Sequence, residues 1–150
     1  MPLWILSTGV LMMALTVAIH AYGATKWLGF VVTWHNGWEA VDRTRDLYQA
    51  VISTAVVLLL LHFSEIVLWA VFYILLPDNA GLADINEAIY FSMVTFTTVG
   101  YGDVTLKVGW QLLGGMEAMV GITVFGLTTA LLFSVLQRLQ LVHHPASHDQ

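Results

Sequence analysis

One short stretch of this sequence has residues whose types and spacing suit ion chemistry, the run from Thr97 to Asp103. Gly100 and Gly102 permit backbone angles that a residue with a Cβ adopts only under strain, and those angles let successive carbonyl oxygens point the same way. A ring of such carbonyls, with a threonine hydroxyl as its innermost ligand, replaces the water around a dehydrated potassium ion. The run therefore predicts an ion-binding loop, with potassium at the first four of these residues: Thr98, Val99, Gly100, Tyr101, Gly102 and Asp103.

The side chains of Val99 and Tyr101 should then face away from the ion and wedge against protein behind the loop. The alternative is a glycine-rich turn of a soluble protein that matches by chance. Here the run follows a short helical stretch and lies between two long apolar segments, a position that favours a pore.

Composition places the chain in a membrane, because 58% of its residues are hydrophobic and only 10% are charged. Three apolar segments are each near or above the ~20 residues that cross the hydrocarbon core: about Leu3 to Tyr22, about Tyr48 to Leu76 and about Trp110 to Leu136. The sequence therefore predicts an all-α membrane protein with three transmembrane helices. A signal peptide is the alternative for the first segment, although no Lys or Arg precedes its apolar core.

Charge asymmetry indicates how these segments are oriented. If all three cross, four basic residues lie on one side and only Lys107 lies on the other: Lys26, Arg43, Arg45 and Arg138. The positive-inside rule makes the first side cytoplasmic. We therefore expect a multi-pass protein of the cell membrane, with the N-terminus and the ion-binding loop outside and the C-terminus in the cytoplasm.

The chain divides into three parts, an N-terminal transmembrane helix with a cytoplasmic connector (1–47), a pore domain (48–139) and a short cytoplasmic tail (140–150). The connector, from Gly23 to Leu47, contains aromatic residues such as Trp27, which suit the headgroup level of a bilayer. It predicts either an interfacial helix from about Trp38 to Gln49 or an anchoring loop with no further role.

The stretch before the ion-binding loop predicts a short helix. Pro77 to Gly81 is typical of a turn. Asp84 suits the N-cap position, with Glu87 three residues later as in a capping box. The apolar run from Ala88 to Phe96 is too short to cross a bilayer, so we expect a re-entrant pore helix buried among other helices.

From Tyr48 to Leu139 the chain resembles the pore domain of tetrameric potassium channels, and it looks closest to the small bacterial ones. The strongest part is the run from Thr98 to Asp103, and the stretch from Gly121 to Leu127 is similar to the inner helix of proton-gated members. The resemblance implies a four-fold homotetramer of outer helix, pore helix, selectivity filter and inner helix, to which this chain adds its first helix. It also implies a gating hinge at Gly121 and a cavity lined by Ile122, Phe125 and Thr129.

Three positions depart from that family pattern. Glu117 adds an acid to the inner helix, one turn before Gly121. Val94 stands where proton-gated relatives often have a pore-helix glutamate, which weakens any expectation of the same filter inactivation. Phe133 stands where they have a small residue on the cytoplasmic side of the cavity. It shares one helix face with residues four positions apart, namely Phe125, Thr129 and Gln137. A ring of Phe133 side chains is therefore a candidate hydrophobic gate, and packing between subunits is the alternative.

Ionisable residues at membrane depth are costly and tend to be paired or functional. Glu117 is a candidate for filter support through a pore-helix hydroxyl such as Thr95, and a purely structural buried acid is the alternative. His62 and Glu65 share a helix face, and His20 lies on the first segment. We expect a His–Glu hydrogen bond that ties the two helices together. A metal or proton site is the alternative, weakened because we expect His20 nearer the cytoplasmic face than His62.

Together these features predict a potassium-selective channel that needs no cofactor besides potassium ions. The net charge of −5 and the lack of a basic patch argue against a nucleic-acid partner, and no catalytic constellation stands out, so no enzymatic activity is expected. The expected partners are potassium ions, the lipid bilayer and further copies of the chain. A weakly selective cation channel and a non-conducting accessory membrane subunit are the alternatives.

Overall fold

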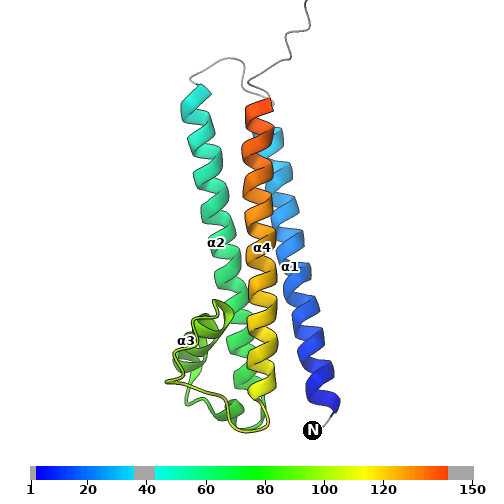
Figure 1. The fold of residues 1–150 in the computed structure, drawn as a ribbon, viewed down its shortest axis with the longest axis vertical. Coiled ribbons are helices and arrows are strands. Elements are labelled where there is room, and N and C mark those ends of the chain that lie inside the picture. The colour runs from blue at the N-terminus through cyan, green and yellow to red at the C-terminus, as the bar shows by residue number, and fades with distance from the viewer. Residues whose placement is uncertain (1–2, 36–42, 142–150) are drawn as a thin grey trace, which may run out of the picture.

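The computed structural model describes residues 3–35 and 43–141, and over these ranges the chain is helical with no strand. Three long helices lie side by side along the length of the molecule, and a short fourth helix lies at one end (Figure 1). Their bounds are α1 Leu3–His35, α2 Arg43–Leu75, α3 Ile85–Phe96 and α4 Gln111–Leu141. The predicted all-α fold is confirmed.

The three long helices are each long and apolar enough to cross a membrane, over Leu3–Val31, Tyr48–Leu75 and Gln111–Gln137. The first helix does not end near Tyr22, as the sequence led us to expect, but continues to His35. No proline follows Pro2 before Pro77, and isolated glycines weaken a helix without breaking it. The predicted connector is therefore shorter than Gly23 to Leu47.

A polar contact between α1 and α2 explains why Trp27, an aromatic residue of the predicted connector, belongs to α1. The indole nitrogen of Trp27 donates to the Thr54 hydroxyl on α2 over 3.0 Å, and Trp69 donates to Thr16 over the same distance. Trp27 is therefore part of α1 rather than of a connecting loop, and its side chain packs on α2. Of the predicted interfacial helix Trp38–Gln49, residues 38–42 lie outside the described ranges, and residues from Arg43 onward belong to α2.

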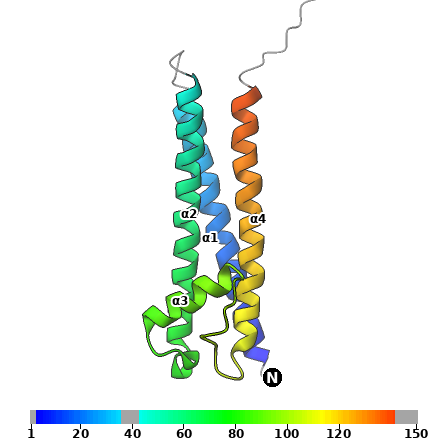
Figure 2. The same cartoon turned by 60° about the vertical axis from the view of Figure 1, so that its left-hand side comes forward.

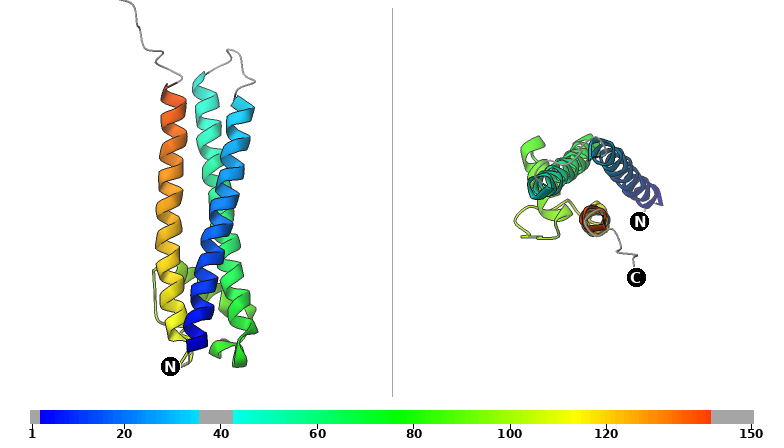
Figure 3. Two further views of the ribbon diagram at one scale, coloured as in Figure 1. Left: turned by 90° about the vertical axis from the view of Figure 1, so that its right-hand side faces the viewer. Right: turned by 90° about the horizontal axis from the view of Figure 1, so that it is seen from above.

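The order of the helices sets which ends of the chain lie together. The beginning of α1 and the loop that follows α3 lie at one end of the bundle, whereas the end of α1, the beginning of α2 and the end of α4 lie at the other (Figures 1 and 3). The chain therefore crosses the bundle three times. Three crossings agree with the predicted number of membrane spans. The arrangement also agrees with the prediction that the N-terminal end lies on the same side as the loop.

The short helix α3 lies across the bundle between α2 and α4 (Figure 2). It begins where the sequence predicts, because the Asp84 carboxylate caps it by accepting hydrogen bonds from the backbone nitrogens of Asn86 (2.8 Å) and Glu87 (2.9 Å). The Glu87 carboxylate accepts from the backbone nitrogen of Ala83 rather than that of Asp84. Before it, Pro77–Gly81 (η1) forms the expected turn. One side of α3 is buried, through Ala88, Phe91, Ser92 and Phe96.

Candidate ion pathway

The backbone that follows α3 has an unusual pattern of dihedral angles. The φ angle is positive at every second residue, with values of 62° at Thr98, 57° at Gly100 and 78° at Gly102, and it is not positive at the two residues between them. In an extended strand successive carbonyls point to opposite sides. A change in the sign of φ at every second residue turns these carbonyls toward one side. The sequence indicated this geometry for the two glycines but not for Thr98.

Backbone hydrogen bonds attach the start of this loop to the end of α3. The amide of Thr98 donates to the carbonyl of Thr95 over 2.9 Å, and the amide of Gly100 donates to the carbonyl of Val94 over 3.2 Å. The loop therefore folds back along the helix that precedes it. A pocket of about 150 Å³ lies between the two, with Val94, Thr95, Phe91 and Asp103 among its lining residues.

The far end of the loop is held by a contact that the sequence did not indicate. The Tyr90 hydroxyl on α3 donates a 2.7 Å hydrogen bond to Oδ2 of Asp103. This bond holds the pKa of the Asp103 carboxyl below its ordinary value, and the carboxylate raises the pKa of Tyr90. The two residues are 13 positions apart, so only the path of the loop brings them together.

The side chains that we expected to wedge behind the loop are largely exposed among the described residues. Val99 is 52% exposed and Tyr101 is 73% exposed. Large apolar side chains at such positions in a membrane protein lie against lipid, a pore or another subunit. Most of the Tyr101 side chain is therefore uncovered within the described part of the chain.

The predicted cavity residues of α4 fall into two groups. Ile122 and Phe133 are 62% and 60% exposed, and Thr129 is exposed as well. Phe125 is turned partly inward, because its ring lies 4.4 Å from the His62 ring and 6.0 Å from the Phe96 ring, measured between centroids. One exposed side of α4 thus contains Ile122, Thr129 and Phe133. Phe125 packs toward α2 and α3 instead.

Glu117 is completely buried where α4 meets α2 and α3. The Tyr73 hydroxyl donates to its Oε2 over 2.7 Å, and Ser92 contacts its Oε1. The α3 hydroxyl beside Glu117 is therefore Ser92 and not Thr95, because Ser92 is on the buried side of α3 whereas Thr95 lines the pocket behind the loop. The sequence indicated the acid and the kind of partner but missed Tyr73 entirely.

Gly121 lies where α4 crosses the end of α3. A Cβ added there would collide with the Phe96 carbonyl oxygen and lie 3.0 Å from the carbonyl carbon. The absence of a side chain at this position permits close backbone packing. This is a structural requirement for glycine that is independent of any hinge.

His20, His62 and Glu65 come together in the middle of the bundle. Nδ1 of His20 forms a 3.0 Å hydrogen bond with Oε1 of Glu65. This bond is the predicted His–Glu link between α1 and α2. The expectation that His20 lies nearer the cytoplasmic face than His62 is wrong. Because α1 extends to His35, His20 is near the middle of its helix and level with His62.

Comparison with known proteins identifies one similarity. A family model described as "Ion channel" matches residues 56–138, which is more than half of the chain and includes most of α2, all of α3, the loop and most of α4. No curated protein and no solved structure gives a significant match.

Proposed function

The chain belongs to the ion-channel family, and we propose that it forms a homotetrameric, potassium-selective pore in which Thr98–Asp103 is the selectivity filter. The observation that carries this proposal is the alternation of φ in the loop. It supports a row of carbonyl oxygens that face one side and can replace the hydration shell of potassium. α3 then serves as a re-entrant pore helix.

The angle at Thr98 adds weight to this proposal. A positive φ is rare for a β-branched residue, and such a conformation costs on the order of 1–3 kcal/mol and persists mainly at ligand and active sites. The glycines relieve that cost at two positions, but Thr98 bears it. The use of its hydroxyl as a ligand at the inner end of the carbonyl row accounts for a threonine, rather than a glycine, at this position.

Assembly of several copies follows from what one loop lacks, and the proposal takes four copies from the resemblance to tetrameric channels. One loop supplies carbonyls from a single direction, whereas a dehydrated potassium ion needs oxygens all around it. The exposed side chains of Val99 and Tyr101 are available to pack on neighbouring copies. The exposed side of α4, with Ile122, Thr129 and Phe133, then lines the inner cavity.

Ion flux through the purified chain tests the proposal. The protein is reconstituted in liposomes under opposed potassium and sodium gradients, and the reversal potential is measured. A value near the potassium equilibrium potential is expected. Equal sodium permeation would instead indicate a weakly selective cation channel, and a tetramer without current would indicate an accessory subunit.

Two glycine variants separate the filter from general backbone effects. Gly100→Ala places a Cβ at a φ of 57° within the loop, and Gly109→Ala places one at a φ of 107° beyond the loop with open space around it. We expect Gly100→Ala to abolish selective current and Gly109→Ala to retain it. Equal effects of the two variants would argue against a filter at this loop.

A further inference from the structure

A buried group of polar side chains lies at the junction of the three long helices. His20 comes from α1, His62 and Glu65 come from α2, and all three are almost fully buried. Thr128 comes from α4, and its hydroxyl lies 3.2 Å from Nε2 of His20 and 2.9 Å from Nε2 of His62. Each of the three helices therefore contributes to one cluster.

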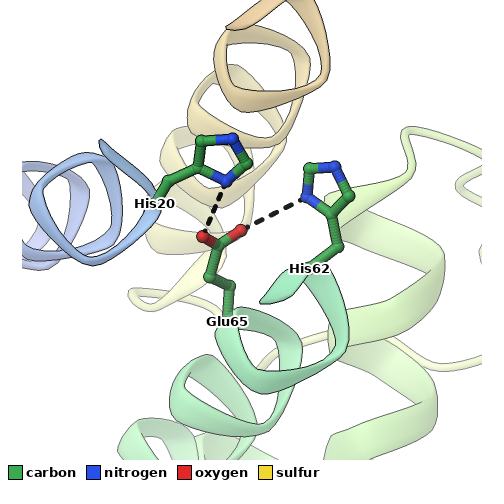
Figure 4. A group of neighbouring side chains, drawn as sticks. All are labelled: His20, His62 and Glu65. Carbon is green, nitrogen blue, oxygen red and sulfur yellow. Dashed lines mark hydrogen bonds and ion pairs between the residues drawn. The ribbon is translucent and has the colours of Figure 1, made fainter. Parts of the chain in front are cut away.

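The ligand atoms of this cluster converge. Nδ1 of His20 is 3.0 Å from Oε1 of Glu65, and Nδ1 of His62 is 3.3 Å from Oε2. Figure 4 shows the two imidazoles side by side, with one nitrogen of each ring facing a different carboxylate oxygen. One ligand atom from each of the three residues lies within 4.8 Å of the others.

These separations are close to those of a metal centre. Zinc and similar ions bind histidine nitrogen and carboxylate oxygen at about 2.0–2.2 Å, which places tetrahedral ligand atoms about 3.4 Å from one another. The two nitrogen–oxygen separations are close to this value, whereas the widest separation among the three ligand atoms, which is at most 4.8 Å, must shorten for such an ion to bind. Two imidazoles and one carboxylate are also the ligand types of an open three-residue zinc site, whereas calcium and magnesium prefer oxygen alone.

The hydrogen-bonding capacity of the Thr128 hydroxyl also favours a bound metal ion. When both Nδ1 lone pairs bind a metal, each ring carries its proton on Nε2, and a hydroxyl oxygen has two lone pairs that accept both N–H groups. Without a cation, both rings donate from Nδ1 to Glu65, and both Nε2 atoms need a donor. Thr128 has one proton to donate, so one Nε2 is left unpaired unless the cluster takes up an additional proton.

We propose that His20, His62 and Glu65 bind one divalent first-row transition-metal ion of the zinc type, with Thr128 orienting both imidazoles from the other side. The metal links α1 to α2 directly, and Thr128 extends the link to α4. Outer partners of this kind fix the tautomer and orientation of ligating histidines. The site is a new one and does not depend on the proposed potassium selectivity.

Cobalt spectroscopy on the full chain tests this site. The protein is purified with a tag that contains no histidine, treated with a chelator and titrated with Co²⁺. We expect one Co²⁺ per chain with intense visible bands of a four-coordinate nitrogen and oxygen site, and competition by Zn²⁺. Absence of stoichiometric binding by the folded protein would overturn the proposal and leave the additional proton as the occupant.

Other histidines must be removed as a source of adventitious binding. A background variant replaces the remaining histidines by glutamine: His35, His143, His144 and His148. Binding should be unchanged in this background. If binding disappears with these replacements, the metal was held by them, and the proposed site is wrong.

Substitutions within the cluster complete the test. In that background, His20→Gln, His62→Gln and Glu65→Gln should each remove the cobalt bands. Because these variants could disturb folding, Thr128→Val provides a milder change that retains shape and loses only the hydroxyl. It should weaken Co²⁺ affinity by about 10–100-fold, and Thr128→Ser should restore it. Equal affinity of Thr128→Val and the parent protein would contradict the assigned role of Thr128.

Discussion

Gly121 on α4 lies directly against the carbonyl group of Phe96, the last residue of α3. This contact sets the depth at which the end of α3 meets α4. Thr98, the first residue of the loop with a positive φ, lies only two positions beyond Phe96. The position of the loop after α3 therefore depends on close backbone packing at one glycine.

Gly121→Ala should displace the end of α3. A Cβ at this position meets backbone rather than a flexible side chain, and overpacking of this kind costs about 1–3 kcal/mol. We expect a lower melting temperature in detergent and a loss of potassium flux in liposomes. Gly115→Ala is the matched control, because a Cβ there meets nothing within 4 Å. Similar melting temperatures for the two variants would show that the end of α3 can move away from position 121 without loss of stability.

Tyr90→Phe should release the far end of the loop. The Tyr90 hydroxyl is the main cause of the lowered pKa of Asp103, so this pKa should rise toward its ordinary value in the variant. A group whose pKa is lowered by folding stabilises the folded state at neutral pH, and the stabilisation disappears as the pH falls through the lowered pKa. The parent loop should therefore resist external acid to a lower pH than the variant.

Carbon-13 NMR of the Asp103 carboxyl, together with current measured at decreasing external pH, checks this prediction. Asp103→Asn is the control, because an amide cannot titrate in this range and retains a group for Tyr90 to contact. The same titration midpoint for Asp103 in the parent protein and in Tyr90→Phe would refute the role given to the hydroxyl.

Glu117→Leu should destabilise the protein by leaving the buried Tyr73 hydroxyl without its acceptor. An unpaired buried polar group costs about 1–3 kcal/mol. Glu117→Gln should be much milder, because an amide can accept from Tyr73 and donate to Ser92. Thermal unfolding of a double-mutant cycle with Tyr73→Phe measures the coupling directly. Additive effects of the two substitutions would mean that the hydrogen bond contributes nothing.

Phe133→Ala tests the candidate gate. If a ring of Phe133 side chains closes the inner mouth by excluding water, the smaller residue should raise closed-state leak by on the order of tenfold or more. Single-channel recording measures this leak. Leu127→Ala changes another exposed apolar residue on a different face of α4 and should have little effect. An unchanged leak in Phe133→Ala would assign the residue to packing between subunits.

Local features of this chain could be predicted well from its residues. Hydropathy identifies the three membrane-spanning helices, because the cost of placing polar groups in hydrocarbon is a property of each segment alone. The cap of α3 at Asp84 and the positive φ at Gly100 and Gly102 also follow from nearby residues. The end of α1 was predicted less well, since no proline marks it and packing on α2 keeps Trp27 helical.

Contacts between distant residues required the tertiary structure. Ser92 rather than Thr95 meets Glu117, and His20 lies level with His62 rather than nearer the cytoplasmic face. Each of these contacts depends on the rotation and depth of one helix against another, and a small change in either would bring a different side chain into place. The sequence alone determined which segments are helical, which of them are long and apolar enough to cross a membrane, and where glycines permit the alternating backbone angles of the loop. Only packing between helices decided which buried polar groups on different helices pair, because such a pair joins residues that neither local propensity nor hydropathy relates.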